Sequence, residues 1–371
     1  MKGFFRLSLL IACLLVLLPP GGIKVRGQVS TGGTSIAPEV PDAEVRPTGT
    51  WNIYEPENLF LELTPYSCGL FVSVPSPLLF AGTPITGIVS ITPGTGQFKS
   101  LEPSFPGKIK GIRGLYNQGD TVAVLFSERT FMGLFDPSTK SWLPRSNWLQ
   151  TGTQVKAAGE EQGNLWVALE GQIALYHAGK LVKQWPYPQG LPPLKLQALV
   201  SAESSAWLVL ESLREQAVRW LAKVTPEGFE TLYSLEAAGS AASLMVAALS
   251  PRYVWLAFGT AAGGASRLFA WEILTSSLSE VVLPDTPGDG SRGDILITAL
   301  ETAGDELWIG TAGAGVIRCS MASSTDTPGD LVLEVLETSP EKLNRKTVYD
   351  FVPAPGAMWV LSTGLVVEYK K

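Results

Sequence analysis

The stretch Asp305–Ser320, DELWIGTAGAGVIRCS, decides how the rest of the chain is interpreted. It predicts two short β-strands, Leu307–Thr311 and Val316–Ser320, joined by a tight glycine-rich turn, because short apolar runs bounded by glycine are typical of hairpins. The same pattern, centred on an aromatic or small apolar residue, recurs along the chain. Its seven centres are spaced 43, 43, 41, 48, 53 and 51 residues apart and are Phe80, Ala123, Trp166, Trp207, Trp255, Trp308 and Trp359.

Seven such segments at a period of about 40–50 residues are typical of a β-propeller, in which each repeat forms one four-stranded blade. The last repeat supplies only three strands before the chain ends at Lys371, and we expect Trp51–Tyr54 (WNIY) to supply the fourth, because an open sheet edge would otherwise remain. The predicted fold is therefore all-β: a seven-bladed β-propeller with four-stranded antiparallel blades, closed by an N-terminal strand that completes the last blade.

The N-terminus predicts export. Lys2 and Arg6 precede the apolar segment Leu7–Leu18, which Pro19-Pro20-Gly21-Gly22 ends, and this pattern is typical of a signal peptide. We expect residues 1–27 to be the signal peptide, residues 28–50 a flexible Gly/Pro/Ser/Thr-rich linker and residues 51–371 the propeller. The alternative is a lipobox at Leu10–Cys13, which would make Cys13 a lipidated N-terminus. We expect a monomer in the periplasm or outside the cell, in contact with a membrane only through an uncleaved or lipidated N-terminus.

The net charge of the chain bears on which partners it can bind. The chain has a formal net charge of −6, and removing residues 1–27, which carry four cations and no acids, lowers it to about −10. An acidic chain without a cluster of lysines and arginines is a poor ligand for nucleic acid, and we predict no nucleic-acid partner. After signal cleavage the remaining cysteines are Cys68 and Cys319, which the predicted blades separate, so we expect both to stay reduced.

The sequence presents no catalytic constellation. The one histidine, His177, has no motif beside it that supplies a nucleophile and an orienting carboxylate, and we expect it on the outside of a blade. We predict no cofactor, no catalytic residue and no zinc site from Cys68 and Cys319, because these two lie on different strands of non-adjacent predicted blades. The loop Pro284–Asp294 has a composition that can wrap calcium, although its spacing does not match an EF-hand, and the preferred interpretation is a solvated loop without metal.

The positions ten residues before each repeat centre are the candidate binding residues. If they point towards the central channel, one rim of the ring carries two cations, an aromatic side chain and a carboxylate, and such a rim could hold an anionic or sugar-like ligand. A polar channel without a ligand is the alternative. Exposed aromatic side chains around Trp148 and Trp185–Pro188 would suit a partner, unless they pack beneath their own loops. The candidate binding residues are Arg113, Lys156 and Tyr349 at this spacing, with Asp350 next to Tyr349 and Arg345 in the preceding loop.

Leu307–Arg318, LWIGTAGAGVIR, resembles the bacterial repeat family of two-component regulator propellers, and Phe135–Trp142 resembles the outer hairpin common in such propellers. The resemblance implies a β-propeller that occurs as a periplasmic sensor region or as a free exported protein. Its motif residues are structural and carry no functional residue with them. We therefore expect a non-enzymatic binding or scaffold propeller that contacts a protein or carbohydrate through one face. The alternatives are a lyase or glycosidase acting on polysaccharide and a ligand-sensing subunit of a signalling system.

Overall fold

The computed structural model describes one compact unit within Val45–Lys371. The described residues are 49–55, 69–73, 78–83, 87–92, 95, 97–101, 112–126, 129–161, 163–188, 194–202, 204–214, 218–235, 242–260, 265–283, 295–321, 333–338, 340, 342–343 and 345–371. The expected signal peptide and nearly all of the expected linker lie outside them, as do Cys68 and the loop Pro284–Asp294.

The strands of these residues form seven antiparallel sheets, numbered here in chain order. Sheets one to three are β2 (Gly69–Ser73), β3 (Leu78–Thr83), β4 (Gly87–Thr92), β5 (Gln97–Leu101); β6 (Ile112–Gln118), β7 (Thr121–Phe126), β8 (Phe131–Asp136), β9 (Ser141–Trp142), β10 (Leu149–Gln150); and β11 (Ala157–Glu161), β12 (Asn164–Leu169), β13 (Gln172–His177), β14 (Lys180–Pro186). Sheets four and five are β15 (Leu194–Ala202), β16 (Ser205–Ser212), β17 (Arg219–Thr225), β18 (Gly228–Ser234); and β19 (Ala242–Leu249), β20 (Tyr253–Thr260), β21 (Arg267–Glu272), β22 (Ser277–Val281). Sheets six and seven are β23 (Ile297–Ala303), β24 (Glu306–Thr311), β25 (Val316–Ser320), β26 (Glu334–Thr338); and β27 (Val348–Ala354), β28 (Ala357–Ser362), β29 (Leu365–Lys370), β1 (Thr50–Tyr54).

The prediction of seven four-stranded blades is wrong. Six of the described sheets have four strands, whereas sheet two has five, because β9 and β10 both pair with β8. The outer strand is divided by Pro144 and the short 3-10 helix η1 (Arg145–Asn147). Proline cannot donate to a strand ladder, so pairing stops there and resumes at Leu149.

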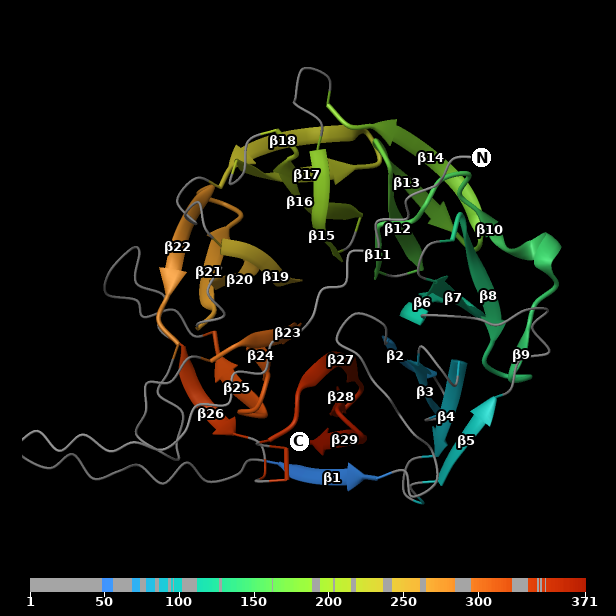
Figure 1. Cartoon of the computed structure of the whole chain (residues 1–371), viewed down its shortest axis with the longest axis vertical. Coiled ribbons are helices and arrows are strands. Elements are labelled where there is room, and N and C mark those ends of the chain that lie inside the picture. The colour runs from blue at the N-terminus through green and yellow to red at the C-terminus, as the bar shows by residue number, and fades with distance from the viewer. Residues whose placement is uncertain are drawn as a thin grey trace, which may run out of the picture. The chain divides into compact units, whose positions relative to one another are not determined.

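The sheets are arranged around a common axis (Figure 1). Each innermost strand contacts the innermost strand of the next sheet, in the order β2, β6, β11, β15, β19, β23, β27, and β27 contacts β2. The series therefore returns to its start. Between neighbouring sheets lie separate apolar clusters, which contain the buried repeat tryptophans Trp166, Trp207, Trp255, Trp308 and Trp359.

Packing between sheets explains why the second strand of each repeat is the most recognisable in the sequence. Both faces of that strand are covered by neighbouring sheets, so β12, β24 and β28 are apolar at nearly every position and buried almost throughout. The fit is tight at Gly310, where an added Cβ would lie 2.6 Å from Val348 Cγ1. The neighbouring sheet therefore leaves no room for a side chain at position 310.

The two ends of the described unit meet in sheet seven. Strand β1 pairs antiparallel with β29, with Trp51 opposite Tyr369 and Ile53 opposite Val367. The Trp51 ring contacts Tyr369 at 4.8 Å and Trp308 of sheet six at 6.2 Å, both edge-on. Residues at the start of the unit thus stabilise the join between sheets six and seven.

A buried ion pair lies at the same join. Arg318 donates to Glu306 Oε1 at 2.6 Å and to the Tyr369 hydroxyl at 2.6 Å, and Lys371 Nζ lies 3.0 Å from Glu306 Oε1. Burial pushes the pKa of Glu306 upward, but the hydrogen bonds from Arg318 and Lys371 outweigh burial, and the pKa falls below its usual value. The carboxylate therefore stays ionised inside the structure.

Replacing Trp51 by alanine tests the contribution of β1. We expect Trp51→Ala to lower the free energy of unfolding by about 1–3 kcal/mol, because the half-buried indole fills the space between Tyr369 and Trp308. Thermal denaturation measures the change. The control is Thr50→Ala on the same strand, where the side chain is exposed. Equal melting temperatures for the two variants would contradict the packing described.

Replacing Glu306 by glutamine tests the buried pair. At pH 7 we expect Glu306→Gln to lower the free energy of unfolding by about 2–4 kcal/mol, because Arg318 would keep its buried charge without its carboxylate partner. The folded-state pKa of Glu306 lies below its unfolded value, so its contribution is complete above about pH 4.5 and disappears as pH falls through the folded pKa. Denaturant titrations at pH 7 and at successively lower pH should thus show a difference in stability between wild type and variant that disappears as the pH falls through the folded-state pKa of Glu306. Glu230→Gln, at an exposed ion pair, is the control.

Candidate functional site

Five innermost strands carry a β-bulge at equivalent positions near their first residues. The ladder register shifts between Ile112 and Gly114, Leu196 and Ala198, Leu244 and Val246, Ile297 and Ala299, and Val348 and Asp350. The extra residues are Arg113, Gln197, Met245, Thr298 and Tyr349. We call the face of the ring at which the innermost strands begin the bulge face, and the opposite face, where these strands turn back into the second strands, the turn face.

A bulge changes where a side chain can point. In a sheet packed on both sides, the side chains of regular positions alternate between the two neighbouring sheets, and none points along the plane of the sheet towards the axis. A bulged residue leaves this alternation, which re-aims its side chain. The exposures agree: Arg113 is exposed between buried Ile112 and Gly114, and Met245 is 38% exposed next to Leu244 at 8%.

The structure places all five predicted site residues at the bulge face. Arg113 is the bulged residue of β6, and Lys156 directly precedes β11, which contacts β6. Tyr349 is the bulged residue of β27, Asp350 follows it, and the exposed Arg345 lies in the turn before β27. The five residues thus come from sheets two, three and seven.

Hydrogen bonds hold some of these side chains in place. Lys156 Nζ donates to Gln154 Oε1 at 2.7 Å, and the Tyr349 hydroxyl lies 3.0 Å from Thr363 Oγ1. Asp350 Oδ1 accepts a hydrogen bond of 3.0 Å from the backbone N–H of Phe351. The rim is therefore partly preorganised.

Tyr116 links two of the predicted residues and was missed by the sequence analysis. Its ring lies over Gly114, where an added Cβ would meet the tyrosine hydroxyl at 2.4 Å. Burial raises the pKa of Tyr116 strongly, the carboxylate of Asp350 raises it further, and the guanidinium of Arg113 lowers it. The phenol therefore stays protonated and lies within electrostatic reach of Arg113 and Asp350. The signal that could have found it is a large aromatic two residues beyond a glycine.

A second polar cluster lies at the bulge face of sheet four. The carboxylate of Glu211 accepts hydrogen bonds from Gln197, the bulged residue of β15, and from Arg219. Arg219 is buried and its guanidinium lies 5.4 Å from the centre of the Phe258 ring. Glu211 and Arg219 were not predicted, because neither occupies the repeated position that marks Gln197.

Two of the predicted exposed aromatic side chains, Trp148 and Trp185, are buried. Trp148 is buried among Phe131, Phe126 and Trp142, and its Nε1 donates to the Leu143 carbonyl at 2.9 Å. Trp185 is 7% exposed and stacks on Trp166. The interpretation in which the ring packs beneath its own loop is confirmed for Trp148, whereas Trp185 is buried as part of strand β14.

Other predicted features lie away from the rim. His177 ends β13, is exposed, and its Nδ1 lies 3.1 Å from Asn164 Oδ1. Cys319 is a free thiol in the core, where burial raises its pKa to about 12 and leaves it inert. Within the described part of the chain, no group of three or more His, Cys, Asp or Glu side chains could hold a metal ion.

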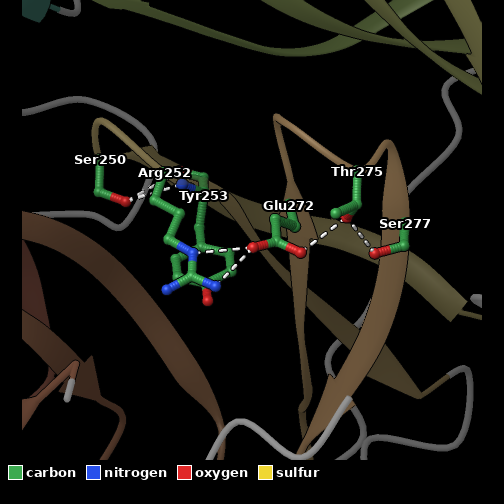
Figure 2. A network of polar contacts seen from close by, with 6 residues as sticks. All are labelled: Ser250, Arg252, Tyr253, Glu272, Thr275 and Ser277. Atoms are coloured by element: carbon green, nitrogen blue, oxygen red, sulfur yellow. Dashed lines mark hydrogen bonds and ion pairs between the residues drawn. The ribbon is translucent and has the colours of Figure 1, made fainter. Parts of the chain in front are cut away.

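The turn face has its own polar network, shown in Figure 2 for sheet five. Arg252 contacts Glu272 Oε1 through Nε at 2.8 Å and through a terminal nitrogen at 2.7 Å. Thr275 donates to Glu272 Oε2 at 2.6 Å and also lies 2.7 Å from Ser277. Hydrogen bonds from Thr275 and Arg252 lower the pKa of Glu272. The charges of this network are therefore satisfied internally.

No model of a known protein family matches the chain, and no curated protein matches it. Solved structures do. Catalytically inactive virginiamycin B lyase from Staphylococcus aureus with quinupristin matches with a TM-score of 0.57 at 12% identity, over 87% of this chain and 99% of that one. The extracellular domain of a protein described as a hybrid two-component system from B. thetaiotaomicron matches with a TM-score of 0.57 at 13% sequence identity. The match covers 86% of this chain and 40% of that one. The structure of the RRP9 WD40 repeats matches with a TM-score of 0.58 at 12% sequence identity, over 86% of this chain and 99% of that one.

These similarities establish the class of protein. At 12–13% identity they show the fold alone, an all-β propeller. The resemblance of the LWIGT segment to the two-component regulator propellers receives support only at this level, from the two-component extracellular domain. Among the described residues, no helix is long and apolar enough to cross a membrane.

The network of Figure 2 makes a prediction for the turn face. We expect Arg252→Ala to lower the free energy of unfolding by no more than about 1 kcal/mol, because the Arg252 side chain is half exposed and its ion pair is screened by water. Chemical denaturation measures this. A loss several times larger would show that the network is structurally essential.

Proposed function

We propose that the protein is an exported, non-enzymatic binding module that holds its partner against the bulge face. The observation that carries the proposal is the set of five bulges. Their flanking residues are mostly apolar or small, as packing between sheets requires, whereas the bulged residues are a cation, an amide, a thioether, a hydroxyl and a phenol. Packing does not require such diversity, and bulges commonly re-aim side chains at functional sites.

The position of the candidate residues supports one continuous surface. Arg113, Lys156, Tyr349 and Arg345 come from three sheets but lie at the same end of their innermost strands. Binding sites on rigid scaffolds are assembled in this way, from strand ends and the loops beside them. Export rests on the N-terminal pattern of residues 1–27.

A sensing subunit is the second candidate. It is favoured by the fold shared with the extracellular domain of the two-component protein, together with the LWIGT resemblance. In that case the partner of the bulge face would be a membrane-bound signalling protein.

Site-specific photo-crosslinking tests the proposal. A photoreactive amino acid is placed at Arg113 or at Arg345 in the full chain, and the exported protein is irradiated in its own cell envelope. We expect a discrete cross-linked species from both positions. The control is Leu274, which is 87% exposed on the turn face of sheet five. A species formed only from Leu274, or none from the bulge face, would overturn the proposal.

A further inference from the structure

Met245 differs from the other methionines of the chain in its exposure. Apart from Met1, the methionines are Met132, Met245, Met321 and Met358, and all of these lie among the described residues. Met132 and Met358 are buried in the core at 0% and 2% exposure, and Met321 packs against the apolar cluster between sheets five and six. Met245 is 38% exposed. In the described part of the chain, Met245 is therefore the methionine that solvent reaches most readily.

The fold gives the Met245 side chain a defined position. Met245 is the bulged residue of β19, so its side chain leaves the alternation that buries Leu244 beside it. It lies over Gly259 of β20, where an added Cβ would be 3.0 Å from Met245 Sδ and 3.2 Å from Met245 Cγ. Because Gly259 has no side chain, the thioether rests directly on the backbone of β20 while the side chain stays open to solvent.

Met245 also differs in chemistry from the other bulged residues. Gln197, Thr298 and Tyr349 each make a hydrogen bond to another group of the protein. Arg113 carries a charge. A thioether is only a weak hydrogen-bond acceptor, so Met245 offers a partner apolar contact through a soft, polarizable sulfur. A reaction that makes this sulfur polar would remove the apolar contact from the set of bulged residues.

We propose that Met245 is an oxidation site that regulates the bulge face, with hydrogen peroxide as the oxidant. The sulfur donates a lone pair to one peroxide oxygen, the O–O bond breaks, and the second oxygen leaves as water after proton transfer. The thioether thus becomes a sulfoxide and loses two electrons, which the peroxide gains. Methionine sulfoxide reductases return the sulfoxide to the thioether, so the change is reversible.

Oxidation alters what the bulge face presents. The sulfoxide oxygen is a hydrogen-bond acceptor, and the flexible apolar side chain becomes polar and chiral. A partner surface that covers the thioether would then bury a polar group without a hydrogen bond, which weakens binding. This regulatory role rests on the proposed binding function of the same face, whereas the reactivity of Met245 does not.

Peptide mass spectrometry of the folded full chain, sampled during exposure to hydrogen peroxide, tests the reactivity. We expect Met245 to be oxidised at least about tenfold faster than Met132 and Met358, because a core methionine reacts only when the structure opens locally. Met321 should also react more slowly than Met245, since it is packed against an apolar cluster. Oxidation of Met132, Met321 or Met358 at the rate of Met245 would overturn the inference.

Photo-crosslinking tests the regulation. The purified full chain with a photoreactive amino acid at Arg113 is oxidised, freed of peroxide and irradiated with untreated cell envelope, so that the partner itself is not oxidised. We expect the yield of the cross-linked species to fall about fivefold on oxidation. The fall should be absent when Met245→Leu is compared with itself before and after peroxide. The matched control, Met321→Leu, should keep the sensitivity of the wild type.

The outcomes separate the two proposals. A fall of equal size in Met245→Leu, no fall in the wild type, or a melting temperature lowered by oxidation of Met245 would each overturn the regulatory role. If the unoxidised wild type captured no partner, the proposed function would fail and the regulatory role with it, while the oxidation rates would still decide whether Met245 is the reactive site. If capture succeeded and was insensitive to peroxide, the proposed function would stand and only its regulation would be wrong.

Discussion

The structure depends on the packing of each sheet between two others. Both faces of every sheet are covered, so stability comes from the apolar side chains that meet in the clusters between neighbours, and the strands near the axis have little room. Gly310 illustrates this lack of room, because a Cβ atom at this position would collide with the side chain of Val348. At the last of these joins the core residues come from both ends of the described unit, since Trp51 and Tyr369 pack on Trp308 together with the buried Arg318–Glu306 pair.

The same constraint determines where a binding site can form. Side chains at regular positions are buried in contacts with the next sheet, and the backbone edge of each innermost strand faces the axis. A side chain can point away from the neighbouring sheets only where the alternation of side chains along the strand is interrupted. The bulges of β6, β15, β19, β23 and β27 interrupt it at equivalent positions. The scaffold is therefore rigid at the flanking residues and variable at the bulged ones.

This division explains what could be predicted from the sequence. The second strands were found because burial on both faces leaves an uninterrupted apolar run, as around Trp166 and Trp308. The bulged positions Arg113 and Tyr349 could be singled out because they keep a fixed distance from those runs. The outer strand of sheet two was missed, because an outer strand packs less and Pro144 interrupts it without changing the repeat length. Tyr116, Glu211 and Arg219 were missed because their roles depend on contacts across the fold, which no local spacing encodes.

The polar contacts of the two faces follow from the same constraint. On the turn face, short hairpin turns bring cations and acids of adjacent strands together, so that Arg252 and Glu272 satisfy each other. On the bulge face, Arg113 leaves the regular ladder because it is bulged, and Arg113 and the carboxylate of Asp350 both lie within electrostatic reach of Tyr116. A side chain that leaves the ladder at a bulge can be offered to a partner, whereas one that pairs with its neighbour across a hairpin turn is already committed to the fold.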